Sequence, residues 1–226
     1  EGDIGHERID PQIPDLVGAA RDATALWALF SDTLQDADCE LLLDQKATVE
    51  NIKSAIRETM DSAESDDLVI LTFAGHGTRD HRLVAHNTTL VDCNESTIAM
   101  GDLARQFKES RARAVICILD CCFSGGAPAR VLEDSPASRG MPFDPETFSG
   151  SGLRMITAAG LDEAAYEHPV HRHRLLTKAL IDVLTRTGGT VSLVAAMDEA
   201  QDIIRADAAA MGITQTPILF GMIDGG

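Results

Sequence analysis

Two short glycine-rich motifs contain the residue types that nucleophilic catalysis requires. The first reads Phe-Ala-Gly-His-Gly and contains His76, and the second reads Asp-Cys-Cys-Phe-Ser-Gly-Gly and contains Cys122. A cysteine is a good nucleophile only as a thiolate, so it needs a neighbouring group that lowers its pKa or takes its proton. Histidine suits that task near neutral pH. We therefore expect a cysteine–histidine pair if the fold brings the two motifs together.

Each motif follows an apolar run that is typical of a buried strand. Residues 69–73 lead into the first motif, and residues 114–119 lead into the second. Ligands of open parallel sheets bind at the carboxyl ends of the strands, so neighbouring strands could deliver His76 and Cys122 to one crevice. The flanking glycines would let backbone N–H groups approach a substrate carbonyl. Cys121 and Cys122 would point in opposite directions along a continued strand, so at most one of them can face the site.

Other interpretations of the two motifs are less favoured. A histidine or a cysteine that follows a strand is more often structural than catalytic, but finding both at matching strand ends favours a site. Zinc ligation is disfavoured because adjacent cysteines lack the separation of two to four residues that lets both bind one tetrahedral ion. A Cys-x-x-Cys redox pair is absent from the sequence. We therefore expect no metal at these motifs.

The composition argues against several classes of function. The chain has 226 residues and a net charge of −17, from 19 Lys+Arg and 36 Asp+Glu, without a basic run. This balance argues against a nucleic-acid-binding surface. The cysteines are five in number and three of them crowd one strand end, which favours a reducing compartment such as the cytoplasm over a disulfide framework. No apolar run approaches the ~18 residues that a membrane span needs.

The predicted elements that position the motifs alternate between helices and strands. Apolar residues at helical spacing predict a helix after Pro14, another near Leu103 and two more in the last third of the chain. A further helix is predicted to begin after Thr48, whose hydroxyl can serve as its N-cap. The predicted strands cover residues 39–43, 69–73, 114–119, 153–157 and 217–220. This alternation predicts an α/β fold: a three-layer α/β/α sandwich with a mostly parallel sheet.

The two motifs resemble those of caspase-like cysteine peptidases, most closely the bacterial metacaspase and orthocaspase group. Those proteins carry a small residue-Gly-His-Gly motif and an Asp-x-Cys-x-Ser-Gly motif. The resemblance implies that Cys122 is the nucleophile, that Cys121 is left for packing, and that His76 is the general base. It also implies an oxyanion hole made by the backbone N–H groups of Gly77 and Cys122. The 46 residues between His76 and Cys122 fit the caspase spacing of about 50.

The resemblance extends over nearly the whole chain. Residues 16–23 resemble the first helix of the family, and residues 158–167 resemble the opening of its small subunit. It implies a single caspase-like peptidase domain over residues 1–226. The implied parts are a large-subunit-like part (1–126), an inter-subunit loop (127–152) and a small-subunit-like part (153–226).

The resemblance also implies a substrate preference. In metacaspases the S1 pocket is acidic and accepts Arg or Lys, and two of its carboxylates fall on Asp22 and Asp120 in this sequence. Two converging carboxylates repel each other unless a cation joins them, which favours a basic P1 side chain. Asp162 and Glu163 are further candidates for the pocket. The alternative is that Asp120 caps local backbone N–H groups and that Asp22 only decorates a helix.

The loop at 127–152 contains Arg130 and Arg139, so an Arg-specific peptidase could cut itself there. Long loops inside compact domains are usually functional or disordered. We therefore state self-processing in this loop as a hypothesis.

One departure from the family lies near the start of the chain. The family's first strand should precede the first helix, but residues 1–14 are polar and contain proline. Either the chain is a fragment that has lost this strand, or another segment supplies it, and we expect the domain to be part of a longer protein. Bacterial relatives are often fused to or encoded with sensor and effector modules, which implies such a partner. No cofactor is expected. Calcium activates several metacaspases, but the sequence has no Asp/Asn ladder of the EF-hand kind, so calcium dependence stays open.

The first interpretation is thus a cysteine endopeptidase that cleaves protein or peptide substrates after Arg or Lys, activated within a bacterial defence or cell-death system. A second interpretation is a catalytically silent module with the same fold that serves as an interaction scaffold. A third is a thiol hydrolase of another class that acts on small amides.

Overall fold

A single six-stranded sheet forms the centre of the computed structural model, which describes residues 9–34, 37–78, 82–121, 152–160, 163–188 and 190–222. The strand order is β3-β2-β1-β4-β5-β6. Three central strands run parallel: β1 (Leu68–Gly77), β4 (Ala114–Cys121) and β5 (Leu153–Thr157). The outer strands pair antiparallel: β2 (Arg82–Val84), β3 (Thr97–Ala99) and β6 (Ile218–Met222). The sheet is therefore mixed, with a parallel centre that carries both motifs.

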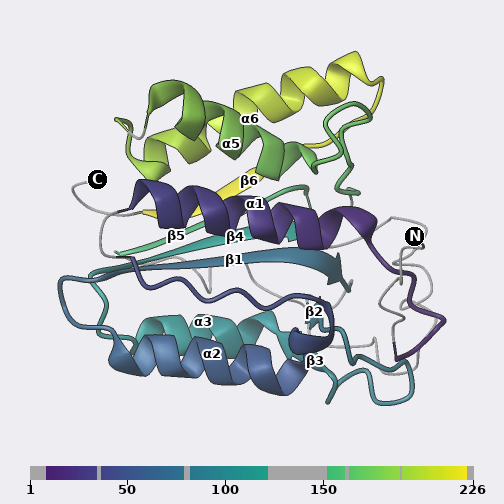
Figure 1. Ribbon diagram of the computed structural model, residues 1–226, viewed down its shortest axis with the longest axis vertical. Coiled ribbons are helices and arrows are strands. Elements are labelled where there is room, and N and C mark those ends of the chain that lie inside the picture. The colour runs from purple at the N-terminus through teal and green to yellow at the C-terminus, as the bar shows by residue number, and fades with distance from the viewer. Residues whose placement is uncertain are drawn as a thin grey trace.

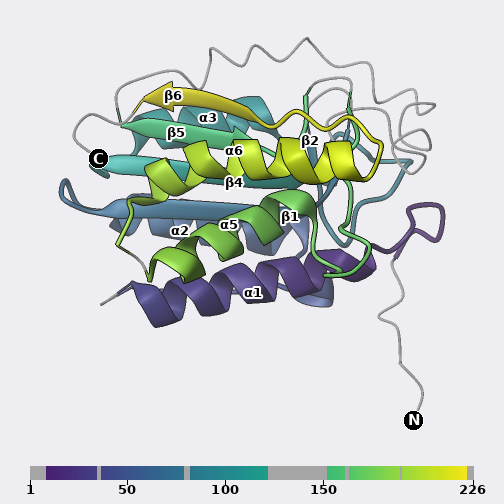
Figure 2. The same ribbon diagram turned by 90° about the horizontal axis from the view of Figure 1, so that it is seen from above.

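Helices cover both faces of the sheet, as Figures 1 and 2 show. One face is covered by α2 (Val49–Ser62) and α3 (Met100–Glu109). The other is covered by α1 (Val17–Thr33), α5 (Leu175–Thr187) and α6 (Leu193–Ala210). A short 3-10 helix, η1 (Asp44–Lys46), precedes α2. The predicted three-layer α/β/α sandwich is confirmed.

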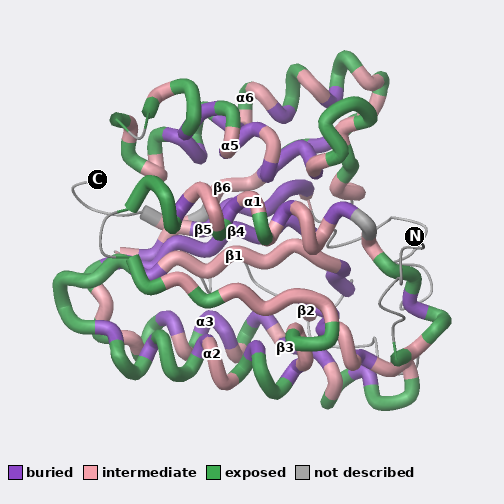
Figure 3. Tube along the Cα trace, viewed as in Figure 1, coloured by how far each residue is buried: buried purple, intermediate pink, exposed green. Residues whose placement is uncertain are grey.

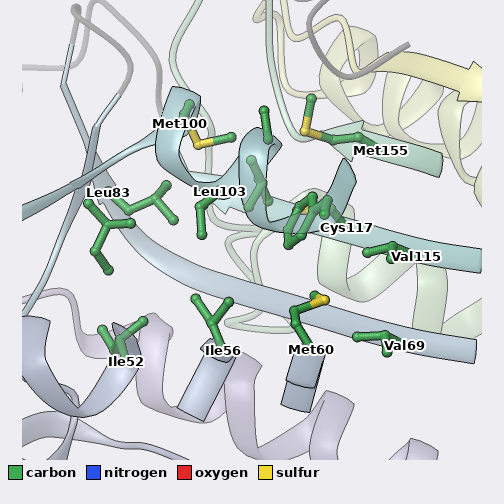
Figure 4. Packing of buried hydrophobic residues seen from close by; sticks show 14 of the residues in the cluster. Ile52, Ile56, Met60, Val69, Leu83, Met100, Leu103, Val115, Cys117 and Met155 are labelled. Atoms are coloured by element: carbon green, nitrogen blue, oxygen red, sulfur yellow. The ribbon is translucent and has the colours of Figure 1, made fainter. Parts of the chain in front are cut away.

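The core follows from the alternation of side chains along β4. Val115, Cys117, Leu119 and Cys121 pack toward α2 and α3, whereas Ile116 and Ile118 pack toward α1, α5 and α6. Figure 3 shows buried residues along β4 and β5 and on the inward sides of the helices, whereas most of β1 has intermediate burial. Figure 4 shows the first of these layers, in which residues of α2 face Val115, Cys117 and Met155. A strand buried on both faces reads as a continuous apolar run, which explains the pattern at 114–119.

Local signals in the sequence position several helices. The Thr48 hydroxyl accepts a hydrogen bond from Asn51 N–H at 3.3 Å, which confirms the predicted N-cap of α2. Ser192 caps α6 in the same way through Ala195 N–H at 3.2 Å. At the other end of α5, Gly188 takes the left-handed conformation with φ of 58°, which glycine adopts at little cost.

The strand predicted at 39–43 is not formed: within the described residues, 37–43 have no strand pairing. A strand exists only with a partner that shares its backbone hydrogen bonds. Over residues 68–75, β1 pairs with β4, and it pairs with β2 only at His76 and Gly77. The apolar side chains of the 39–43 segment are instead accommodated by packing, Cys39 toward α1 and Leu42 toward α2. The loop predicted at 127–152 lies outside the described residues except for Gly152.

Candidate active site

The parallel pairing of β1 and β4 brings the two motifs to the same edge of the sheet. The register places Gly75 opposite Cys121, at the carboxyl end of both strands. His76 follows Gly75 in the chain, and Cys122 follows Cys121. Cys122 itself lies outside the described residues, so the structure places the strand that leads to it and not its side chain. Cys121 is fully buried in the layer beneath α2 and α3, which confirms its predicted packing role.

His76 is held by a backbone carbonyl that precedes α1. Its Nε2 lies 2.7 Å from the oxygen of Pro14, and the imidazole is 7% exposed. A carbonyl oxygen can only accept a hydrogen bond, so Nε2 carries the proton and, in the neutral ring, Nδ1 carries the lone pair. The contact therefore selects the tautomer in which Nδ1 can accept a thiol proton.

Pro14 could not be predicted as a site residue from the sequence, because a backbone carbonyl can come from any residue type. Its position directly before the first predicted helix is the only signal that the chain offers. The polar segment 1–14 thus contributes, at Pro14, the carbonyl that orients His76.

Glycine at 75 is required by the neighbouring aromatic ring. A Cβ built at Gly75 would lie 2.6 Å from Cζ of Phe73, well inside van der Waals contact, so the ring would have to move. The next glycine, Gly77, lies opposite Leu83 of β2. Thr78 N–H donates to Arg82 O at 3.0 Å. Because hydrogen-bonded and non-bonded pairs alternate along antiparallel strands, the Gly77 N–H points away from β2.

Asp22 of α1 is completely buried behind this edge. Its Oδ1 lies 2.7 Å from His173 Nδ1, and its Oδ2 accepts from Arg174 N–H at 3.4 Å. Burial and the charge of Asp120 raise the pKa of Asp22 to about 6, and the hydrogen bond from His173 opposes that rise. Asp22 therefore does not merely decorate a helix, and it lies close enough to Asp120 for the two charges to interact.

Asp120 of β4 is also buried, with 1% exposure. Its Oδ2 accepts hydrogen bonds from the backbone N–H and the hydroxyl of Thr177, at 3.0 and 2.7 Å. Burial raises the pKa of Asp120, while the charge of Arg174 and the Thr177 hydrogen bonds act in the opposite direction. Thr177 lies in the first turn of α5, whose N-cap residue Arg174 makes no side-chain cap bond. Asp120 thus caps α5 from a distant strand, where a negative charge is favourable.

One oxygen of the Asp120 carboxylate is unused by this cap. Within the part of the chain that the structure describes, Asp120 Oδ1 has no hydrogen-bond partner. Buried carboxylate oxygens are normally hydrogen-bonded. This oxygen is therefore a buried acceptor that the described contacts leave without a donor.

A third carboxylate, which the sequence analysis missed, lies beside Asp22. Glu167 forms an isolated antiparallel bridge with Arg174, so the segment between them is a tight hairpin. A Cβ built at Gly18 of α1 would lie 3.1 Å from Glu167 Oε2 and 3.8 Å from Asp22 Oδ2. Glu167 is exposed, in contrast to the buried Asp22. The sequence marks Glu167 only as the last residue of the segment 158–167, which resembles the opening of the family's small subunit.

Asp162 and Glu163, the other predicted pocket residues, have no described contact with Asp22 or Asp120. Glu163 accepts hydrogen bonds from Gly160 N–H and Thr216 N–H at 3.2 and 2.5 Å, so it ties two loops together. Asp162 lies outside the described residues, as do Arg130 and Arg139. Among the residues described, no group of three or more His, Cys, Asp or Glu side chains could hold a metal ion. No helix in the described ranges is long and apolar enough to span a membrane.

A cation completes the cluster. The Arg174 guanidinium is almost fully buried, and its Nη1 donates to Asp120 O at 2.8 Å and to Gly75 O at 3.3 Å. The cluster thus contains the carboxylates of Asp22 and Asp120, the Arg174 cation and the His173 imidazole, with Glu167 at its exposed side. Such a site can bind a cation near a histidine that is poised to accept a proton.

Comparison with known proteins agrees with this architecture. A family model described as a caspase domain matches residues 4–224. Among solved structures, the chain is similar to protein GSU0716 from Geobacter sulfurreducens, with a TM-score of 0.67, 14% identity, and coverage of 97% of this chain and 92% of that one. It is also similar to caspase-1 from Spodoptera frugiperda, with a TM-score of 0.62, 14% identity, and coverage of 90% and 77%. At this identity the structural likeness shows the fold alone. A search of curated proteins found no match.

Proposed function

Because the chain belongs to the caspase domain family, we propose that it is a cysteine endopeptidase in which His76 and Cys122 form the catalytic pair. The observation that carries this proposal is the Pro14–His76 hydrogen bond at the carboxyl end of β1, opposite the end of β4 that leads to Cys122. This hydrogen bond supports the proposal because it holds the imidazole in the tautomer whose Nδ1 can accept a proton, as a general base must.

In the proposed reaction, Nδ1 of His76 takes the thiol proton of Cys122, and the thiolate sulfur attacks the scissile carbonyl carbon. The Pro14 carbonyl stabilises the imidazolium by accepting its Nε2–H. The tetrahedral oxyanion accepts hydrogen bonds from the N–H groups of Gly77 and Cys122. The intermediate collapses to a thioester as the imidazolium gives its proton to the leaving amine. Water, deprotonated by His76, then hydrolyses the thioester and regenerates the thiol.

We further propose that the enzyme cleaves after Arg or Lys. Support comes from the three carboxylates of Asp22, Asp120 and Glu167, two of which interact electrostatically and one of which is exposed. The unsatisfied Oδ1 of Asp120 adds an acceptor for a guanidinium or an ammonium group. An acidic P1 side chain would add repulsion to a site that already holds a surplus of negative charge.

Peptide amides that differ only at P1 test this proposal, with Cys122→Ala as the matched inactive variant. We expect wild-type protein to cleave the Arg and Lys peptides at least a hundredfold faster than the Asp and Leu peptides, and Cys122→Ala to cleave none. An Arg-based electrophile should label Cys122 in the wild type. A preference for Asp or Leu would overturn the specificity, and absence of both cleavage and labelling would overturn the peptidase assignment in favour of a scaffold.

We also propose that this peptidase acts within a regulated bacterial defence or cell-death system, fused to or associated with a sensor or effector module, and that it cuts its own 127–152 loop at Arg130 or Arg139. Support for this part is the family membership and the two arginines. A gel that compares wild type with Cys122→Ala tests the self-cleavage: fragments should appear only in the wild type. The same fragments in both proteins would show that another protease makes them.

A further inference from the structure

The side chain of Arg174 contacts the ends of both strands that carry the catalytic motifs. Its Nη1 donates to the carbonyl of Gly75 at 3.3 Å and to the carbonyl of Asp120 at 2.8 Å. Gly75 directly precedes His76, and Asp120 lies two residues before Cys122. A single guanidinium nitrogen therefore joins β1 to β4 at the level where the described ladder between them ends, at the Gly75–Cys121 pair.

Arginine is suited to this task for physical reasons. Carbonyls at the end of a parallel ladder lose the N–H partners that continued strands would provide, and buried carbonyls without partners are costly. A guanidinium offers several donors in a fixed plane and stays charged at every relevant pH. Arg174 is only 6% exposed, so the surrounding protein fixes the position of its guanidinium. Its hydrogen bonds to the two carbonyls are therefore not weakened by solvent.

The backbone of Arg174 contacts two of the carboxylate residues that are proposed to bind P1. Its N–H donates to Asp22 Oδ2 at 3.4 Å, and it bridges to Glu167 across the hairpin. Its charge also opposes the rise in the pKa of Asp120, the residue that caps α5. Arg174 thus connects the carboxylates proposed to bind P1 with the strand ends that deliver His76 and Cys122.

We propose that Arg174 is a positioning residue for the catalytic pair: it fixes the spacing of the β1 and β4 ends and thereby the alignment of His76 with Cys122. This inference rests on the proposed function of those two residues. The described contacts of the Arg174 guanidinium are to the backbone carbonyls of Gly75 and Asp120, not to the reacting atoms of the catalytic pair. Its loss should therefore lower the rate of the chemical step more than the binding of substrate.

The test uses Arg174→Gln and Arg174→Lys in the full chain, with Arg154→Gln as a matched control. Arg154 lies near the start of β5, at the opposite edge of the parallel strands, and it also donates to a backbone carbonyl, that of Gly221 at 2.9 Å. Steady-state kinetics on an Arg peptide amide, the pH profile of Cys122 alkylation by iodoacetamide, thermal unfolding, and amide hydrogen exchange are measured for all four proteins.

We expect Arg174→Gln to lower kcat about ten- to a hundredfold, the loss that a misplacement of about 1 Å produces, with KM changed less than about threefold. The pH midpoint of alkylation should rise toward about 8.5, the value of an unpaired cysteine. Arg174→Lys should recover part of kcat. Arg154→Gln should lower the unfolding temperature and leave kcat and the alkylation profile unchanged.

Hydrogen exchange separates the failure of this inference from the failure of the proposed function. Exchange at residues 75–78 and 120–121 should rise in Arg174→Gln and not in Arg154→Gln. If exchange there is unchanged, or if the loss of activity lies wholly in KM, Arg174 is not a positioning residue, whatever the activity of the wild type. If the wild type neither cleaves nor shows a lowered alkylation midpoint, the catalytic pair is wrong, and with it any role of Arg174 in aligning that pair.

Discussion

Replacing Asp22 with asparagine should make the protein more stable at neutral pH, and the gain should shrink as the pH falls. The buried Asp22 carboxyl has a pKa near 6, raised from 3.8 by burial and by the charge of Asp120. The folded protein therefore holds this proton more tightly than the unfolded chain does. Between these two values the folded state binds more protons, so stability falls as the pH rises. Asparagine removes the charge and can still hydrogen-bond His173 and the backbone N–H of Arg174.

The size of the effect follows from the same two pKa values. A shift of one unit corresponds to about 1.4 kcal/mol, so the full cost of ionising Asp22 in the folded state is about 3 kcal/mol above pH 7. At about pH 5 the cost is about 1.5 kcal/mol, because the folded carboxyl is then mostly protonated and the unfolded one mostly ionised. The stability difference between variant and wild type should thus grow by about 1.5 kcal/mol from pH 5 to pH 7.5.

Urea unfolding of both proteins at several pH values measures this difference directly. Asp32→Asn, which removes an exposed carboxylate from the same helix, controls for the general effect of one fewer negative charge on an acidic protein. The reasoning is refuted if the difference between Asp22→Asn and wild type is independent of pH, or if the advantage of the variant over wild type shrinks as the pH rises. A pH-dependent gain of equal size in Asp32→Asn would assign the effect to net charge instead of to burial.

Two further substitutions probe the packing that positions the site. Gly75→Ala should lower the free energy of unfolding by about 1–3 kcal/mol, because the new methyl group would lie 2.6 Å from the ring of Phe73 and force it aside. Gly101→Ala in α3, where a Cβ would meet nothing within 4 Å, is its control and should raise stability by about 0.5–1 kcal/mol; thermal or urea unfolding measures both, and equal effects would contradict the steric argument. Thr177→Val should cost about 1.5–3 kcal/mol, because it removes the hydroxyl that donates to the buried carboxylate of Asp120 at 2.7 Å. An unfolding free energy for Thr177→Val within about 0.5 kcal/mol of wild type would mean that this hydrogen bond contributes little, as for an ordinary surface substitution.

The layers of the fold could be predicted because their signals are local. The apolar run at 114–119 predicts a strand buried on both faces, and Thr48 predicts the start of α2 from one hydroxyl. The segment 39–43 shows the limit of such signals: its apolar residues are typical of a strand, but no pairing partner lies beside it among the described residues. Whether an apolar run becomes a strand depends on its neighbours, which the run itself does not encode.

The candidate site could be predicted only where side-chain chemistry marks it. His76 could be predicted because a glycine-flanked histidine follows an apolar strand, whereas Asp22 and Asp120 could be predicted only through the resemblance to metacaspases. Pro14 was not found, because the group that orients His76 is a backbone carbonyl. Glu167 could not be predicted either. It lies near Asp22 because the hairpin that carries it packs against α1 at Gly18, which has no side chain.

Two energetically unfavourable features, a buried ionised carboxylate and a buried carboxylate oxygen without a donor, lie in the same cluster. Asp22 is ionised at neutral pH against a penalty of about 3 kcal/mol, and Asp120 keeps one buried oxygen without a partner in the described structure. Arg174 supplies one positive charge against the carboxylates of Asp22, Asp120 and Glu167, so the cluster retains a surplus of negative charge. A folded protein without a use for that surplus would be more stable with an amide at position 22. In the proposed enzyme, a basic P1 side chain supplies the missing cation and lowers the pKa of Asp22, so substrate binding recovers what folding lost. The instability of the empty site would then be the source of the proposed selectivity for Arg and Lys.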